Sequence, residues 1–266
     1  MKKKEGRSNL ETLFGVKKTP GTDQVRKVLD NIEPKELYGA FDRALGIAGD
    51  GGVLESYRVL EGTMPAAPDG TWYFSSKDIH REHCLTRKTK KRDGGGGALY
   101  YHEMVDAVAV KPGRPVVVLP LIPEFVRNED GKDKQDCERN AAKRRLKTHK
   151  ERYSALKLTV LGDDLYRRHS VCKEMREAGM NFLPACKDES HPWIAEQVKY
   201  PFLQKHENTV WNGRNHIVYR HKWVNGIENR ADGEIMKVNY LYFEIYNVEK
   251  KKTTYKNRRD NKPRNQ

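Results

Sequence analysis

The order of strand-like and helix-like segments in the middle of the chain constrains the fold more than any other feature. Three runs rich in valine, tyrosine and other strand formers occupy residues 64–76, 98–110 and 115–126. A glycine run, GGGG, separates the first two, and a KPGR turn separates the second from the third. Three successive strands of this kind predict an antiparallel meander.

Helices and strands alternate after this meander. Residues 133–150 have apolar positions at helical spacing, with acidic residues first and basic residues last, as a helix dipole favours. A strand at 156–161, a helix at about 168–178 and a strand at 180–187 follow, and Gly179 ends the second helix. We therefore expect a mixed α/β (α+β) sheet in which the first and fourth strands are parallel neighbours. This is the element order of the ribonuclease H-like fold.

Two regions of different character flank this core. Residues 22–47 have helical periodicity and predict two helices that separate near Pro34. Residues 206–256 alternate apolar and polar side chains, and NG dipeptides at 212–213 and 225–226 predict hairpin turns. We divide the chain into an N-terminal helical region with a basic disordered arm, a catalytic core, a β-rich insertion and a basic disordered tail, at residues 1–60, 61–200, 201–256 and 257–266.

The charge balance indicates the kind of partner. The chain has 51 lysine and arginine residues against 37 aspartate and glutamate residues, a net charge of +14. Such a balance predicts a polyanionic partner, although it carries no sequence information. No apolar run approaches the ~18 residues of a membrane span, and no apolar segment follows the basic opening as in a secretory signal. Four widely spaced cysteines predict free thiols in a cytosolic protein.

Two aspartates are candidate metal ligands. Taken alone, Asp69 in DGTWYFSS reads as a turn residue, and Asp163 in LGDDLYRR reads as a helix start or Asx-turn. If the first and fourth strands are parallel neighbours, both carboxylates emerge at one place although 94 residues separate them. Two carboxylates at one place repel each other unless a cation neutralises them. Their hard oxygen ligands suit Mg²⁺ or Mn²⁺, which support in-line displacement at phosphorus.

Several sequence segments together resemble those of a known family. DGTWYFSS, IHREHCLTR, KQDCERNAAKR and VLGDDLY resemble, in this order, the DDE transposases of bacterial insertion sequences. The resemblance covers roughly residues 12 to 250. It implies that Asp69 is the first acid and Asp163 the second, with Asp164 as the alternative second acid and as the more probable residue to cap the loop.

The resemblance also implies an activity and its setting. The expected reaction is Mg²⁺-dependent (or Mn²⁺-dependent) phosphodiester hydrolysis and strand transfer at transposon ends. The expected partner is double-stranded DNA, bound by a homodimer, in the bacterial cytoplasm and at the nucleoid when DNA is bound. No membrane association is expected.

The third acid of these enzymes is not found. In the resembled family it is a glutamate in a helix of pattern Y-x2-R-x3-E-x6-K after the β-rich insertion. Residues 219–228, YRHKWVNGIE, have the wrong spacing for it, so we expect a truncated and impaired transposase. Glu138 is a possible substitute, but we favour its reading as an ordinary acid in the first turn of a helix. The alternatives are an inactive DNA-binding remnant and a host nuclease of the same fold.

Basic and aromatic side chains are candidates for DNA contact, because such residues hold phosphates and stack on bases. One group lies on the helix at 133–150 and the other on the hairpins; sheet packing explains the aromatic members equally well. The candidates are Arg144, Arg145, Arg214, Arg220, Lys222 and Trp223.

One further cluster, IHREHC, has the residue types of a zinc knuckle. Its possible ligands are His80, His83 and Cys84. Three ligands without a second cluster are a weak signal, so we expect these residues to be structural.

Overall fold

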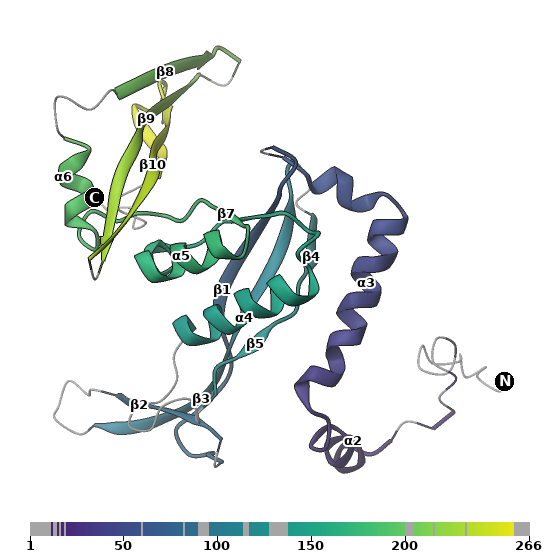
Figure 1. The fold of residues 1–266 in the computed structure, drawn as a ribbon. Coiled ribbons are helices and arrows are strands. Elements are labelled where there is room, and N and C mark those ends of the chain that lie inside the picture. Colours follow the sequence, from purple (N-terminus) through teal and green to yellow (C-terminus); the bar gives the residue numbers. More distant parts are fainter. Residues whose placement is uncertain are drawn as a thin grey trace. The chain divides into compact units, whose positions relative to one another are not determined.

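The chain forms two compact units, Met1–Asp50 and Gly51–Gln266 (Figure 1). The predicted N-terminal arm at 1–10, and the predicted tail from residue 258 onward, lie outside the described residues. The computed structural model describes residues 12, 15, 17–18, 20–59, 61–81, 83–89, 96–113, 117–127, 138–199, 205–214, 216–231 and 233–257.

The first unit contains the two predicted helices. Helix α2 (Thr22–Leu29) and helix α3 (Tyr38–Asp50) are separated by a short 3-10 helix, η1 (Pro34–Leu37). Pro34 stands at the start of η1, where its missing N–H costs no hydrogen bond. Leu45 is buried in α3, whereas the apolar side chains of α2 are exposed. The predicted break near Pro34 is confirmed.

The second unit opens with a 3-10 helix, η2 (Val53–Tyr57), and a mixed sheet. The strand order is β2-β3-β1-β6-β7, and β4 and β5 also pair with β3. The strands are β1 (Met64–Ser76), β2 (Leu85–Thr89), β3 (Gly97–Lys111), β4 (Val117–Pro120), β5 (Glu124–Phe125), β6 (Leu158–Val160) and β7 (Asn181–Phe182).

Strand β1 lies at the centre of this sheet. It pairs antiparallel with β3 and parallel with β6, as the element order predicts. In the parallel ladder Met64 faces Leu158 and Ala66 faces Val160. The first half of β1 is buried, which its apolar residues MPAAP allow. Beyond that half the strand becomes exposed, at Asp69.

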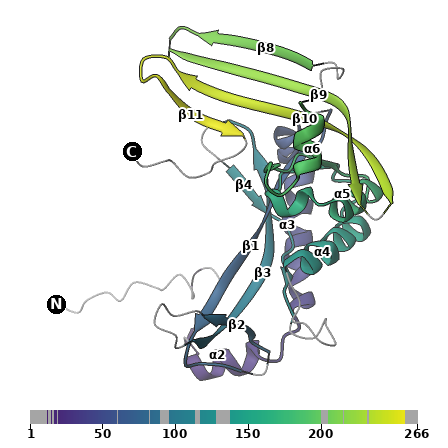
Figure 2. The ribbon, with the colours of Figure 1, turned by 90° about the vertical axis from the view of Figure 1, so that its left-hand side faces the viewer.

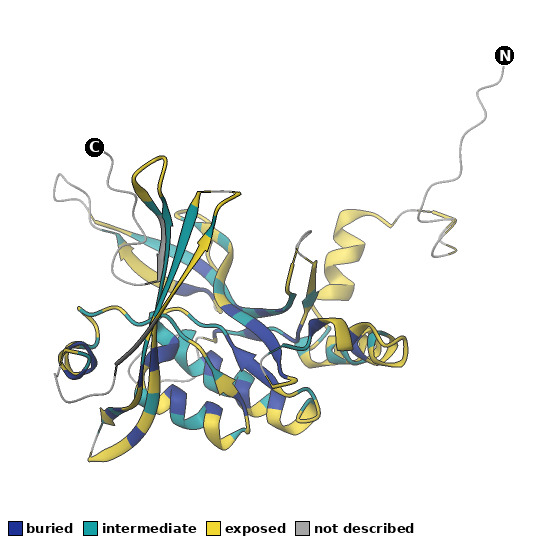
Figure 3. Cartoon of the chain, turned by 90° about the horizontal axis from the view of Figure 1, so that it is seen from above, coloured by how far each residue is buried: buried dark blue, intermediate teal, exposed yellow. Residues whose placement is uncertain are grey.

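Two helices cover one face of the mixed sheet (Figures 1 and 2). Helix α4 (Glu138–Arg152) buries Ala142 and Leu146, and helix α5 (His169–Glu177) buries Val171 and Met175. In each pair the two side chains are four residues apart and therefore lie on one helix face. Figure 3 shows these buried stripes in dark blue. The predicted start of the first helix, residues 133–137, lies outside the described residues.

A four-stranded antiparallel sheet follows, in the order β11-β10-β9-β8 (Figure 2). Asn212 ends β8 as the predicted NG turn requires, but the second predicted NG turn is wrong. Gly226, with φ of 74°, forms a bulge inside β9, where its N–H donates to Asn239 Oδ1 at 3.3 Å. The chain reverses at Gly233 instead. The strands are β8 (Lys205–Asn212), β9 (Ile217–Ala231), β10 (Glu234–Asn247) and β11 (Lys252–Asn257).

Three elements depart from the sequence predictions. Strand β2, with the sequence LTRKT, was not predicted, because it is short and mostly exposed and has charged side chains. Strand β7 is shorter than predicted. Helix α6 (Pro192–Gln197) was not predicted, and its Ile194 packs against Val224 and Ile227 of β9. In the described part of the chain, no helix has the length and apolarity needed to cross a membrane.

Candidate functional site

The parallel ladder of β1 and β6 sets the positions of Asp69 and Asp163. Ala66 faces Val160, and the N–H of Leu161 donates to the carbonyl of Ala66 at 2.7 Å. The ladder ends at Ala66 and Val160, three residues before Asp69 and Asp163, and the charges of both aspartates act on Glu138. Asp69 is an exposed residue within β1, so its reading as a turn residue is wrong. Its carboxylate accepts the N–H of Gly70 at 3.0 Å.

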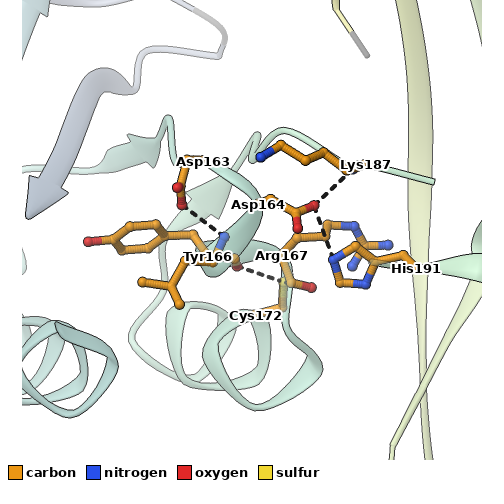
Figure 4. A network of polar contacts seen from close by, with 8 residues as sticks. Asp163, Asp164, Tyr166, Arg167, Cys172, Lys187 and His191 are labelled. Carbon is orange, nitrogen blue, oxygen red and sulfur yellow. Dashed lines mark hydrogen bonds and ion pairs between the residues drawn. The ribbon is translucent and has the colours of Figure 1, made fainter. Parts of the chain in front are cut away.

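Asp163 and Asp164 are adjacent but point in different directions (Figure 4). Asp163 is exposed and caps the 3-10 helix η3 (Asp164–Arg167), accepting the N–H of Leu165 at 2.8 Å. Asp164 accepts the N–H of Lys187 at 2.8 Å and lies 3.3 Å from His191 Nε2. The expectation that Asp164 caps the loop was therefore wrong.

These contacts give the two aspartates different roles. Asp164, with its side chain only 15% exposed, holds the segment from Lys187 to His191 in place. Burial lowers the pKa of His191, which opposes a fully ionised pair. Asp163 presents the exposed carboxylate of the two, which favours it over Asp164 as a ligand.

Glu138 lies at the same place. It is the first residue of α4, and its carboxyl group sits against Gly70 of β1. A Cβ built on Gly70 would lie 2.7 Å from Glu138 Cδ, 2.9 Å from Glu138 Oε2 and 3.0 Å from Glu103 Oε1. A side chain at this position would have to displace these carboxyl groups, which fill the space beside Gly70. The reading of Glu138 as an ordinary helix-start acid missed this contact.

Four carboxyl groups interact in this region, which we call the acidic site: Asp69, Glu103, Glu138 and Asp163. Burial, followed by the charges of Glu103, Asp163 and Asp69, raises the pKa of Glu138 to about 7. The positive end of the α4 dipole would favour ionised Glu138, so burial and repulsion outweigh it. The repulsion between these carboxyl groups is therefore felt at Glu138.

Tyr166 closes the buried side of the acidic site. Its ring packs over Gly162, where a Cβ would come within 2.4 Å of Tyr166 Cβ. The residue is only 3% exposed, and its hydroxyl has no hydrogen-bond partner among the described residues. Burial raises the pKa of Tyr166, and the charges of Glu138, Asp163 and Asp69 raise it further. Behind it, Cys172 Sγ donates to the Tyr166 carbonyl at 3.4 Å and fixes η3 against α5 (Figure 4).

A hollow of about 560 Å³ opens beside Asp163. Its wall includes Asp164 and the first residues of α5, His169 and Ser170. Unlike the acidic site, it has a basic rim, which consists of Arg139, Arg168, Lys187 and Arg230. We call it the basic hollow. A cavity with this rim beside an exposed carboxylate can hold phosphate groups next to an acidic centre.

The two arginines predicted to contact DNA from α4 are bonded to the chain itself. Arg144 donates to Glu124 Oε1 at 3.0 Å and to the Phe125 carbonyl at 2.9 Å. Arg145 donates to the Ile122 carbonyl at 3.2 Å, and burial lowers its pKa. These contacts hold α4 against the segment that contains β5, so they favour a structural role for both residues.

The predicted DNA contacts on the hairpins have a more varied setting. Arg220 pairs with Glu244 at 3.1 Å and lies over the ring of Tyr246 at 5.2 Å. Lys222 and Arg214 are exposed, and Trp223 is half-buried. These residues belong to β9 and to the turn before it, whereas the basic hollow is lined by other cations that the sequence analysis did not single out.

Two of the three possible zinc ligands, His80 and Cys84, contact neighbouring residues. His80 stacks on Tyr100 with ring centroids 4.6 Å apart. Cys84 Sγ accepts the N–H of Arg81 at 3.3 Å and lies 3.4 Å from His102 Nε2. Among the residues that the structure describes, no three histidine, cysteine, aspartate or glutamate side chains are already arranged to hold a metal ion, here or in the acidic site.

Comparison of the chain with protein-family models, with curated proteins and with solved structures found no match.

Proposed function

We propose that this chain is a DNA strand-cleaving and strand-transferring protein of the DDE transposase type. Asp69 and Asp163 would hold Mg²⁺ or Mn²⁺ at the end of a ribonuclease H-like sheet. The observation that carries the proposal is the parallel ladder of β1 and β6, which ends three residues before each of the two aspartates, so that both follow the same end of the paired strands. The central position of β1, with alternating helices and strands after β5, supports the same fold.

The donors of the acidic site fit a hard divalent cation. They are carboxylate oxygens, which Mg²⁺ and Mn²⁺ prefer. The carboxylates repel one another, and this repulsion adds to burial in raising the pKa of Glu138. Asp69 and Asp163 are exposed, and each carboxylate accepts only a local backbone N–H in the contacts described above. When bound, the metal would activate the attacking water or 3′ hydroxyl and stabilise the leaving oxygen.

The residues around the site would position the DNA. Arg139, Arg168 and Lys187 line the basic hollow beside Asp163 and would hold backbone phosphates. The start of α5 lines the same hollow, and the positive end of its helix dipole favours an anion. Asp164 keeps Lys187 in place through its backbone N–H. Phosphate contacts of this kind orient the duplex without reading its sequence.

The test is Mn²⁺-dependent nicking of supercoiled plasmid DNA, measured as conversion to the relaxed form. Asp69→Asn and Asp163→Asn should each abolish nicking. Asp78→Asn, which changes an exposed aspartate in the bend after β1, should leave it intact. Full nicking by both Asp69→Asn and Asp163→Asn would contradict the proposed metal site.

The basic hollow also fits a second candidate function, namely DNA binding without cleavage. In that case the protein would retard plasmid or duplex DNA in a gel but would not nick it with either metal. Retardation without nicking would favour the inactive DNA-binding protein over the transposase.

A further inference from the structure

The first turn of α4 supplies the acidic site with a third acid. We propose that Glu138 binds the divalent cation together with Asp69 and Asp163. The inference rests on the proposed function, because it takes the first two ligands from it. It adds a ligand that the sequence analysis set aside in favour of a structural role.

The contact between α4 and β1 carries the inference. The carboxyl group of Glu138 occupies the place where Gly70 would have a side chain, one residue from Asp69. The buried Ala142 and Leu146 anchor α4 on the sheet, so the position of Glu138 follows from the packing of the whole helix. Asp163 follows β6, and its charge, like that of Asp69, acts on Glu138. Three elements therefore deliver one carboxylate each.

The buried hydroxyl of Tyr166 is an independent sign that something binds here. Its residue is almost fully buried, the charges of Glu138, Asp163 and Asp69 act on it, and it has no hydrogen-bond partner among the described residues. A buried hydroxyl without a partner is unfavourable by roughly 1–3 kcal/mol, and such groups usually have a partner in the functional state. A carboxylate oxygen that turns toward a bound cation would accept a hydrogen bond from this hydroxyl.

The chain order of the three acids differs from that of the resembled enzymes. There the third acid is a glutamate that follows the β-rich insertion, whereas Glu138 lies between Asp69 and Asp163. The three acids and Tyr166 all come from β1, α4 and the segment after β6. The mixed sheet and its first covering helix are thus enough to assemble the site.

The test is Mn²⁺ binding to the full chain, measured by isothermal titration calorimetry in a mildly alkaline buffer. Glu138→Gln keeps the shape of the side chain but removes its charge. Glu151→Gln is the matched control, because Glu151 is an exposed residue of the same helix. Glu138→Gln should weaken Mn²⁺ binding by about tenfold or more, a loss that even an outer-shell partner of a metal can cause. Glu151→Gln should bind as the wild type does.

Three outcomes separate this inference from the proposed function. Weaker binding by Asp69→Asn, Asp163→Asn and Glu138→Gln alike supports the inference. Weaker binding by the two aspartate variants with unchanged binding by Glu138→Gln overturns it and leaves the proposed metal site standing. A wild-type protein that binds no Mn²⁺ overturns both.

A second measurement guards against a folding defect. Thermal unfolding is followed with and without Mn²⁺, since a ligand that binds the folded state raises its melting temperature. Glu138→Gln should melt cooperatively without metal and gain less from Mn²⁺ than Glu151→Gln does. An equal gain by the two variants would count against Glu138 as a ligand.

Discussion

The carboxyl group of Glu138 fills the space beside Gly70, so that a Cβ on the glycine would lie 2.7 Å from Glu138 Cδ. This contact joins the start of α4 to the exposed part of β1, next to Asp69. Real Cβ atoms do not approach other heavy atoms this closely, so any larger residue at position 70 must move the glutamate. The atoms in the way are the ends of two flexible side chains, Glu138 and Glu103. The space can therefore be altered without breaking the backbone.

The first prediction concerns this space. Gly70→Ala should displace the Glu138 and Glu103 carboxyl groups and weaken Mn²⁺ binding by about tenfold or more, as loss of an outer-shell group does. The melting temperature should change by only a few degrees, because the side chains can rotate away. Titration calorimetry and thermal unfolding measure the two effects. Gly46→Ala is the control, since a Cβ at Gly46 in α3 would meet nothing within 4 Å. Unchanged binding by Gly70→Ala would contradict this assignment.

The second prediction follows from the raised pKa of Glu138. In the folded state this pKa is about 7, against an ordinary 4.5, so between these values the folded protein holds a proton that the unfolded chain has released. The unfolding free energy therefore falls as pH rises through this interval and stays lower above it. Without metal and above pH 7, Glu138→Gln should be more stable than the wild type by about 1–2 kcal/mol, after discounting for partial exposure.

Denaturant unfolding in the presence of a chelator measures this difference. Below the ordinary glutamate pKa the two proteins should have the same unfolding free energy, because both are neutral at position 138. A variant that is less stable than the wild type at alkaline pH would mean that Glu138 is stabilised by a partner rather than strained by its neighbours.

The third prediction concerns the basic hollow. Arg168→Ala should weaken binding of duplex DNA and lower the slope of log affinity against log salt by about one unit, as loss of one phosphate contact does. Arg214→Ala, in the exposed turn before β9, tests the hairpin surface in the same way. Fluorescence anisotropy of labelled duplex DNA over a series of salt concentrations measures the affinity and the salt slope of each variant. A change of slope with Arg214→Ala alone would place the DNA on the hairpins.

The mixed sheet could be predicted because its strands differ in composition from the segments between them. The apolar run before Asp69 and the apolar run before Asp163 gave the two strands, and the crossover between them required a parallel pair. Strand β2 escaped prediction because LTRKT is short and polar and lacks the apolar alternation of a half-buried strand. The turn predicted from the NG dipeptide at 225–226 was wrong, because a glycine with positive φ occurs in bulges as well as in turns.

The proximity of Glu138 to Gly70 and Asp69 could not be predicted from the sequence. Where α4 begins depends on the residues before Glu138, which have no apolar pattern. Which strand its first turn faces depends on how Ala142 and Leu146 pack on the sheet. Gly70 was the available signal, since a glycine next to a candidate ligand often marks a close approach by another group. The basic hollow could not be predicted either, because its cationic residues come from four separate segments of the chain.

The fourth prediction concerns Arg144, which the sequence suggested for DNA contact. Its partner Glu124 is only 5% exposed, so removing the guanidinium leaves a buried charge without its ion-pair partner. Arg144→Ala should lower the unfolding free energy by about 3 kcal/mol, and Arg144→Met with Glu124→Leu should recover most of the loss. Denaturant unfolding measures both. If Arg144→Ala reduced the DNA salt slope and left stability unchanged, the contact with Glu124 would be incidental.

The fifth prediction concerns His149, a buried histidine of α4. Burial, and then the charge of Arg145, lowers its pKa from 6.5 to about 4. Between these values His149 is protonated in the unfolded chain but not in the folded protein. The unfolding free energy therefore decreases as pH falls from 6.5 to 4. The full loss is about 3 kcal/mol. His149→Gln removes the titrating group and should be less sensitive to pH by this amount, as measured by denaturant unfolding at both ends of the interval. If the variant loses as much stability as the wild type over this range, His149 is protonated in the folded state and the acid sensitivity comes from other groups.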